Sequence, residues 1–268
     1  MDTRVSRTRA SATTSHTSRL HPNRPENLTI DHSTQSSKQE NEIALKTENL
    51  SKVFDSAAGK IVALDNINFA IKKGEFVSIV GPSGSGKSTL LNMIGALDRP
   101  TSGKVYIDGI DIFSLNDSQL GIIRNNRIGF IFQSFNLINR TTVQKNVKLP
   151  GIIAKMQRAD ADSRTMKILE ALGIADKKDQ KPVNLSGGQQ QRVAIARSLI
   201  NNPSIILADE PTGNLDTKTG EDVFDMLKLL SHKFKRTIIM VTHNPELSES
   251  TDRSIVIRDG RIDQDVTN

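Results

Sequence analysis

The glycine-rich run at residues 81–88 constrains the fold more than any other feature of the chain. It matches the phosphate-binding loop pattern, which requires a strand before it and a helix after it, and it reads Gly81-Pro82-Ser83-Gly84-Ser85-Gly86-Lys87-Ser88. The five residues before it are almost all apolar, as in a buried parallel strand. Glycines let a backbone curl so that its N–H groups surround an anion, and the next helix adds its positive end. The run therefore predicts a parallel α/β core built around a phosphate site.

Two side chains of this loop are suited to nucleotide chemistry. Lys87 supplies a point charge for the β- and γ-phosphates, and Ser88 offers a hydroxyl to Mg²⁺. We take residues 81–88, together with Thr89, as the predicted nucleotide-binding segment.

A pair of acids ends a second buried strand. Asp209 and Glu210 directly follow the apolar residues 205–208, and an acid at the carboxyl end of a parallel strand faces the ligand crevice. We expect Asp209 to hold Mg²⁺ and Glu210 to orient or deprotonate an attacking water. The alternative is that both acids are merely solvated at a strand end, and the phosphate loop upstream argues against it.

The chain divides by composition into a tail and one domain. Residues 1–42 are rich in Ser, Thr, Arg and Asn and poor in apolar residues, which predicts a disordered polar tail. Residues 43–264 form the predicted domain, with an antiparallel layer from strands at 43–54 and 61–71. A helical subdomain is expected at about 134–185. Val223, Met226, Leu227 and Leu230 keep the spacing of a crossover helix.

Charge and composition argue against several classes of protein. The 36 basic and 30 acidic residues give a net charge of +6, and because the basic residues are scattered we expect no nucleic-acid partner. The sequence has no cysteine, which excludes disulfides and thiolate metal sites. No run approaches the roughly 20 apolar residues of a membrane span. We therefore expect a chain that folds in the cytosol.

A third motif narrows the interpretation. Residues 185–189 read Leu-Ser-Gly-Gly-Gln and lie just ahead of the acid pair. Ser186 suits a helix N-cap, but two following glycines weaken a helix unless something approaches closely. With the phosphate loop, this motif resembles the ATP-binding cassette (ABC) ATPases over about residues 43–262. The resemblance implies their nucleotide-binding-domain fold, ATP and Mg²⁺ as cofactors, and ATP hydrolysis. It also implies a head-to-tail dimer in which one chain closes over the partner's γ-phosphate with Ser186, Gly187, Gly188 and Gln189.

The same resemblance assigns further residues. Gln133 matches the family's Q-loop residue, which contacts Mg²⁺ and the attacking water and joins the core to the helical subdomain. His243 matches the switch histidine, which hydrogen-bonds the γ-phosphate. Asp216 matches the D-loop, which crosses the dimer interface. Phe54 stands where the family stacks an aromatic on adenine, and a core phenylalanine on an early strand is an equal alternative.

The motif surroundings at residues 95–103, 132–137 and 208–216 look like the branch for lipoprotein release and for macrolide or antimicrobial-peptide export. The cell-division ATPases lie close to this branch. The resemblance implies a separate transmembrane permease subunit, contacted near residues 133–149, and a peripheral place at the cytoplasmic face of the cell membrane. The dimer partner is either an identical chain or a paralogue. A regulator that pumps nothing and a soluble ABC protein acting on ribosomes or DNA are the rival functions.

Overall fold

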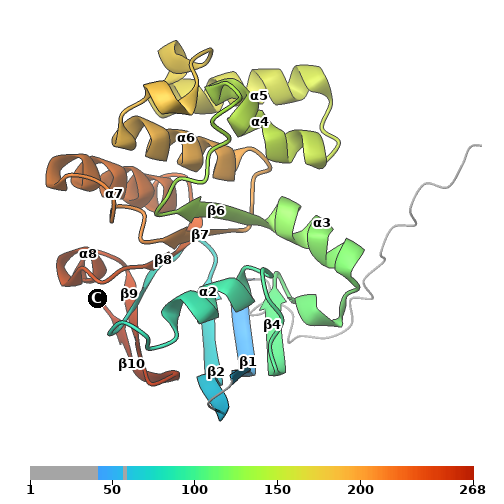
Figure 1. Ribbon diagram of the computed structural model, residues 1–268, viewed down its shortest axis with the longest axis vertical. Coiled ribbons are helices and arrows are strands. Elements are labelled where there is room, and N and C mark those ends of the chain that lie inside the picture. The colour runs from blue at the N-terminus through green and yellow to red at the C-terminus, as the bar shows by residue number, and fades with distance from the viewer. Residues whose placement is uncertain (1–41, 57–58) are drawn as a thin grey trace, which may run out of the picture. The chain divides into compact units, whose positions relative to one another are not determined.

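The computed structural model describes residues 42–56 and 59–268, so the predicted disordered tail lies almost wholly outside the described residues. The described chain contains two sheets (Figure 1). The first is antiparallel, in the order β2-β1-β4-β5, and consists of β1 (Ile43–Ser56), β2 (Gly59–Lys72), β4 (Ser102–Ile107) and β5 (Ile110–Asp111). The second has the order β10-β9-β3-β8-β7-β6, and consists of β3 (Phe76–Val80), β6 (Ile128–Phe132), β7 (Ile205–Asp209), β8 (Thr237–Val241), β9 (Arg253–Arg258) and β10 (Arg261–Thr267).

The inner strands β3, β7 and β8 of the second sheet are buried on both faces, which explains their almost uninterrupted apolar sequences. Strand side chains alternate between the two faces of a sheet. In β7, Ile205 and Leu207 join the core cluster shared with the antiparallel sheet, whereas Ile206 and Ala208 join the cluster under the helices. In β8, Ile239 and Ile238 divide in the same way. Both faces therefore need apolar residues, and the short apolar runs predicted as parallel strands are confirmed.

Helices cover the two faces unequally. α2 lies between the two sheets, while α4, α5 and α6 gather on the far side of the parallel sheet with α7 beside them (Figure 1). The α-helices of the described residues are α2 (Lys87–Ile94), α3 (Asp117–Arg127), α4 (Val143–Ile153), α5 (Arg158–Ala171), α6 (Gly187–Leu199), α7 (Thr217–His232) and α8 (Pro245–Glu249). Three 3-10 turns join them: η1 (Ile112–Ser114), η2 (Ala175–Lys177) and η3 (Pro182–Asn184).

The fold prediction is confirmed as an α/β core with an antiparallel layer and helices inserted after β6. The helical pattern was placed too early, however, because residues 135–142 are not helical and α4 begins at Val143. α3 was not foreseen, although Asn116 and Gln119 form a reciprocal capping box at its start. No helix in the described part of the chain is long and apolar enough to cross a membrane.

Candidate active site

Four neighbouring parallel strands bring the predicted site residues to one edge. β3, β8, β7 and β6 lie side by side in the sheet. Phe132 of β6 pairs with Asp209 of β7, which pairs with Val241 of β8, so these strands end in register. The chain then continues into Gln133, Glu210 and His243, while β3 continues into the phosphate loop. Ligands of such sheets bind at the carboxyl ends of the strands.

The phosphate loop is packed against the turn between β9 and β10. Gly81 has a positive φ of 150°, and a Cβ there would lie only 2.0 Å from the carbonyl oxygen of Ile257. The backbone N–H of Gly260 donates to the carbonyl of Ser85 at 3.0 Å. α2 then begins at Lys87, so its free N–H groups face the loop. A side chain at Gly81 would push the loop off this support.

Lys87 is buried and bonded to the loop itself. Its Nζ donates to the carbonyl oxygens of Gly81 at 2.9 Å and Pro82 at 2.8 Å. An ammonium group has three donors, so one remains for another acceptor. The carbonyls hold the cation in the loop, where a phosphate would need it.

The cleft over the loop has a volume of about 500 Å³ and combines a polar floor with an apolar rim. Ile61 and Val62 form the rim at the start of β2, and both are more than half exposed. Sequence reasoning gave this pair no role in the site. Its signal was two adjacent apolar residues at the start of the strand predicted at 61–71, where alternation of side chains between the two faces would bury only one of them. The other lining residues are Ala63, Gly81, Ser83, Gly84, Gly86, Lys87, Ser88, Thr89, Glu210 and His243. Pro82 and Ser85, also predicted for this segment, support the loop from behind.

Glu210 and His243 both line the cleft, and their side chains are in contact. His243 Nδ1 lies 3.2 Å from Glu210 Oε1. The Glu210 backbone is left-handed, with φ 43°, which is unfavourable for a residue with a Cβ. Its N–H donates to the Val241 carbonyl at 3.0 Å and its carbonyl accepts from the Gly213 N–H at 3.0 Å. These bonds hold the carboxylate at the end of β7 despite the strain.

Asp209 lies behind Glu210 and is partly buried. Burial raises the pKa of the Asp209 carboxyl above its ordinary value, and the neighbouring charge of Glu210 raises it further, while Lys87 opposes both. Two carboxylates and one ammonium therefore share a small volume at the strand ends. A second cation would relieve the repulsion between the two acids.

Gln133 is fixed to the segment after Glu210. Its Nε2 donates to Asn214 Oδ1 at 3.4 Å, and Asn214 Nδ2 donates to the Gln133 carbonyl at 3.0 Å. A Cβ at Gly213 would lie 2.7 Å from Gln133 Nε2 and 3.3 Å from Glu210 Oε2. Because position 213 has no side chain, the Gln133 amide and the Glu210 carboxylate can both lie close to its backbone.

The second glycine motif forms the tip of α6. Ser186 caps this helix through a reciprocal box with Gln189, so the free N–H groups of Gly187 and Gly188 remain at a positive helix end. A Cβ at Gly188 would lie 2.3 Å from Thr219 Cγ2 of α7, which is the close approach that two glycines suggest. Within the described residues, no member of 186–189 lines the cleft over the phosphate loop.

Comparison with known proteins places this geometry in a family. The model of the ABC transporter family matches residues 64–213. The chain is 49% identical over 212 residues to an uncharacterized ABC transporter ATP-binding protein of Thermotoga maritima, covering 79% of this chain and 90% of that one. The chain belongs to the ABC transporter family.

Two further similarities concern structure and domain composition. The dimeric structure of MJ0796 from Methanocaldococcus jannaschii, a bacterial ABC transporter cassette, is 46% identical, with a TM-score of 0.76 over 83% of this chain and 98% of that one. MJ0796 has also been solved as a dimeric post-hydrolysis state with ADP and Pi. The macrolide export ATP-binding/permease protein MacB of Brucella melitensis is 47% identical, but the match covers 83% of this chain and 34% of MacB. This ABC cassette binds and hydrolyses ATP.

The two peripheral residues of the predicted site lie at the edges of the cassette. Phe54 is 41% exposed, so the alternative of a core phenylalanine is wrong. It pairs with Ile61 of the apolar rim, and Lys52 Nζ lies 4.9 Å from its ring centroid. Asp216 caps α7 by accepting from the Thr219 N–H at 3.1 Å. The adenine contact of Phe54 and the interface role of Asp216 stay predictions.

One buried contact of the cassette escaped the sequence analysis. Gln191 of α6 is fully buried, and its Nε2 donates to the Pro211 carbonyl at 2.6 Å, one residue beyond Glu210. A polar side chain on the inner face of a helix was its signal. The contact attaches the helix of the second glycine motif to the loop that carries the acid pair.

Proposed function

We propose that the chain works as one of two cassettes that enclose two ATP molecules head to tail and drive a separate membrane permease for export. One observation supports the proposed dimer: among the described residues, none of 186–189 lines the cleft over the phosphate loop. The helix end that suits a phosphate is therefore available to another chain. The dimeric state of the related MJ0796 supports this arrangement.

The chemistry we propose follows from the residues at the strand ends. Glu210 accepts a proton from, or orients, the water that attacks the γ-phosphate, and His243 contacts the γ-phosphate from the neighbouring strand. Lys87 balances phosphate charge from inside the loop, and Phe54 with Ile61 and Val62 covers the base. The partner's Ser186 and glycine N–H groups close the other side. Positioning and charge account for the rate without a covalent intermediate.

Mg²⁺ is part of this proposal, and the donor set fits it. Ser88, Gln133 and Asp209 offer a hydroxyl, an amide oxygen and a carboxylate, all hard oxygen donors. Within residues 42–56 and 59–268 no group of three or more His, Cys, Asp or Glu side chains could hold a metal alone. This suits an ion that takes its other ligands from phosphates and water. When bound, Mg²⁺ neutralises charge on the β- and γ-phosphate oxygens.

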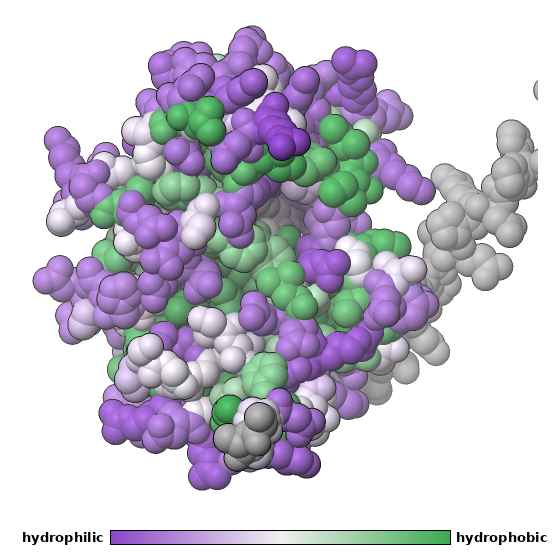
Figure 2. Space-filling model, in the orientation of Figure 1, coloured by the Kyte–Doolittle hydropathy of each residue, from purple (hydrophilic) through white to green (hydrophobic). Residues whose placement is uncertain are grey.

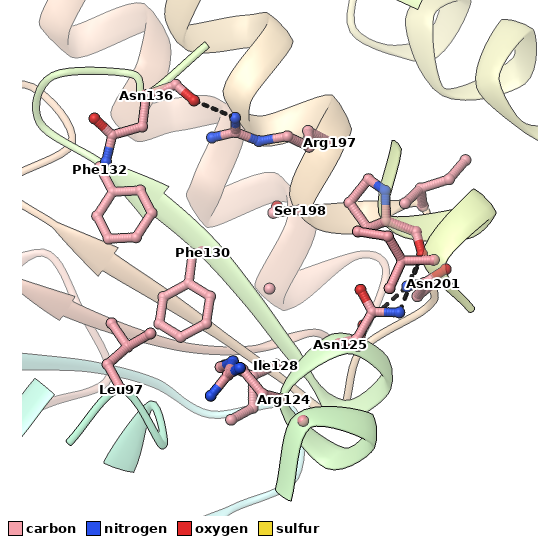
Figure 3. Close-up of a pocket in the computed structure, with 15 residues that line it drawn as sticks. Leu97, Arg124, Asn125, Ile128, Phe130, Phe132, Asn136, Arg197, Ser198 and Asn201 are labelled. Carbon is pink, nitrogen blue, oxygen red and sulfur yellow. Dashed lines mark hydrogen bonds between the residues drawn. The ribbon is translucent and has the colours of Figure 1, made fainter. Parts of the chain in front are cut away.

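A second cleft supports the proposal of a permease partner. It has a volume of about 420 Å³ and lies between α3, β6, α4 and α6. Apolar side chains gather around this hollow (Figure 2), and Leu97, Phe130 and Phe132 face it together with Arg124 and Arg197 (Figure 3). Ile153 at its edge is 61% exposed. We propose that a cytoplasmic helix of the permease docks here, one residue from Gln133, with the cassette peripheral at the cytoplasmic membrane face.

Export is the proposed direction because MacB, a relative described as an export protein, combines an ATP-binding part with a permease. The match covers 34% of MacB, and the permease that we propose for this cassette is a separate subunit. The partner cassette is an identical chain or a paralogue, and the cargo is set by the permease.

The dimer is tested by blocking the tip of α6. In a Glu210→Gln background, which we expect to retain ATP, light scattering should show an ATP-dependent dimer. Adding Ser186→Arg should abolish it, because the long side chain would fill the space at the helix end that phosphate needs, and the capping box with Gln189 would be lost. Ser163→Arg, at an exposed position within α5, is the matched control and should leave the dimer intact. A dimer that persists with arginine at position 186 would contradict the shared pocket.

The permease dock is tested at Ile153. Ile153→Asp should reduce the recovery of the integral membrane subunit captured with the cassette, because a carboxylate would be buried against an apolar helix. Leu229→Asp, at a 51% exposed position on α7 outside the cleft, is the control. Equal recovery with both variants would place the permease elsewhere.

A further inference from the structure

The backbone just after Gln133 takes an unusual path. Phe135 and Asn136 are consecutive and both left-handed, with φ values of 58° and 49°. Asparagine tolerates this region, whereas a bulky aromatic residue is strained there by about 1 kcal/mol or more. Other contacts must hold this path.

Arg197 supplies those contacts from α6. Its Nη2 donates to the Phe135 carbonyl at 2.9 Å and its Nη1 donates to the Asn136 carbonyl. Figure 3 shows the guanidinium reaching from the helix across the wall of the second cleft to Asn136. A guanidinium presents its donors in a rigid planar fork, so it can hold two successive carbonyls in one orientation.

The positive charge of Arg197 is compensated by the backbone of this segment. The side chain is partly buried, and burial lowers the pKa of the guanidinium from its ordinary value. In the portion of the chain that the structure describes, no carboxylate forms an ion pair with it. Two carbonyl dipoles therefore provide the compensation that a buried cation requires.

The segment has one further fixed point on each side. Gln133 is bonded to Asn214, as described above, and the Ile138 N–H donates to Asn146 Oδ1 of α4 at 2.7 Å. Arg197 links the segment to α6 by hydrogen bonds, and Ser186 caps the other end of this helix. Eleven residues separate the two, which is about 16 Å along a helix, and a helix moves as a rigid rod over that length.

We propose that Arg197 is a positioning residue that ties Gln133 to the orientation of α6. When the Ser186 tip engages the partner's nucleotide, α6 carries the Phe135–Asn136 backbone with it, and Gln133 is set against the reacting phosphate. The proposal rests on the proposed function for the roles of Gln133 and of the α6 tip. Arg197 itself is not among the described residues that line the cleft over the phosphate loop.

The first experiment compares two arginines of α6. Arg197→Gln should lower the kcat of ATP hydrolysis roughly tenfold while the KM for ATP changes less than about twofold, since the phosphate loop is untouched. The kcat of Arg197→Lys should lie between those of the wild type and Arg197→Gln, because an ammonium group cannot hold both carbonyls in a planar fork. Arg192→Gln is the matched control: Arg192 donates to the Leu172 carbonyl at 3.4 Å, away from Gln133, and its removal should leave kcat within about twofold.

The second experiment asks whether Arg197 acts through Gln133. In a Gln133→Ala background, adding Arg197→Gln should cause no further loss of kcat, as expected for residues acting in series. An equal tenfold loss in that background, or an unchanged kcat in the single variant, would overturn the proposal. If Arg197→Gln does not fold, the same cycle is run with Arg197→Lys. A chain that fails to dimerise with ATP would refute the shared pocket separately, because this cycle is read from hydrolysis alone.

Discussion

Gly188 offers the sharpest test of how α6 packs against α7. Its backbone is not left-handed, so alanine fits the helix, and only the contact with α7 opposes it. A Cβ at this position would lie 2.3 Å from Thr219 Cγ2, whereas the next neighbour, Thr219 Cβ, is at 3.7 Å. The first distance is a severe overlap and the second is an ordinary contact.

The expected change in the free energy of unfolding follows from two opposing terms. Overpacking of this kind costs about 1–3 kcal/mol, while replacing glycine by alanine in a helix gains at most about 1 kcal/mol. Gly188→Ala should therefore destabilise the chain by about 1 kcal/mol. Thr219→Ser removes only Cγ2 and keeps the hydroxyl, so in that background the same substitution should stabilise by up to about 1 kcal/mol.

Urea denaturation of the four proteins measures this double-mutant cycle. The result expected is a reversal of sign and a coupling free energy of about 2 kcal/mol between positions 188 and 219. Additive effects, within about 0.5 kcal/mol, would refute the contact on which the placement of α6 against α7 rests.

Three other substitutions probe the site and the segment beside it. Glu210→Gln should bind ATP normally and lose hydrolysis by at least about a hundredfold; phosphate release at the wild-type rate would mean that another group activates the water. Lys87→Ala should abolish tight ATP binding in calorimetry, because the ammonium held by two loop carbonyls is the cation nearest the phosphates; unaltered affinity would remove that assignment. Asn146→Ala should lower the free energy of unfolding by about 3 kcal/mol, since the buried amide makes four hydrogen bonds; a loss below about 1 kcal/mol in denaturation would contradict that network.

Much of the core could be predicted because its signals are local. The apolar run at 205–208 has both faces of its strand buried, and the glycine loop follows an apolar strand as its pattern requires. The failures lie where tertiary contacts decide. Residues 135–142 fall within the predicted helical subdomain, but the contacts of Arg197 and Asn146 hold them in an irregular path.

The site divides in the same way. Lys87 and Glu210 were found because one lies in the phosphate-loop motif and the other at a predicted strand end, and His243 was found through the family resemblance. The structure brings all three to one cleft. Gln191, Arg197 and the Ile61–Val62 rim were missed because their partners, Pro211, Phe135 and the phosphate loop, are far away in sequence. The sequence can name a group that reacts, but not the side chain that holds it in place.

The dependence of ATP hydrolysis on protein concentration tests the central claim most directly. If each nucleotide site needs residues from two chains, the rate per chain should rise with concentration in step with the dimer fraction measured by light scattering, and should vanish at high dilution. A rate per chain that stays constant down to concentrations where only monomer is present would contradict it.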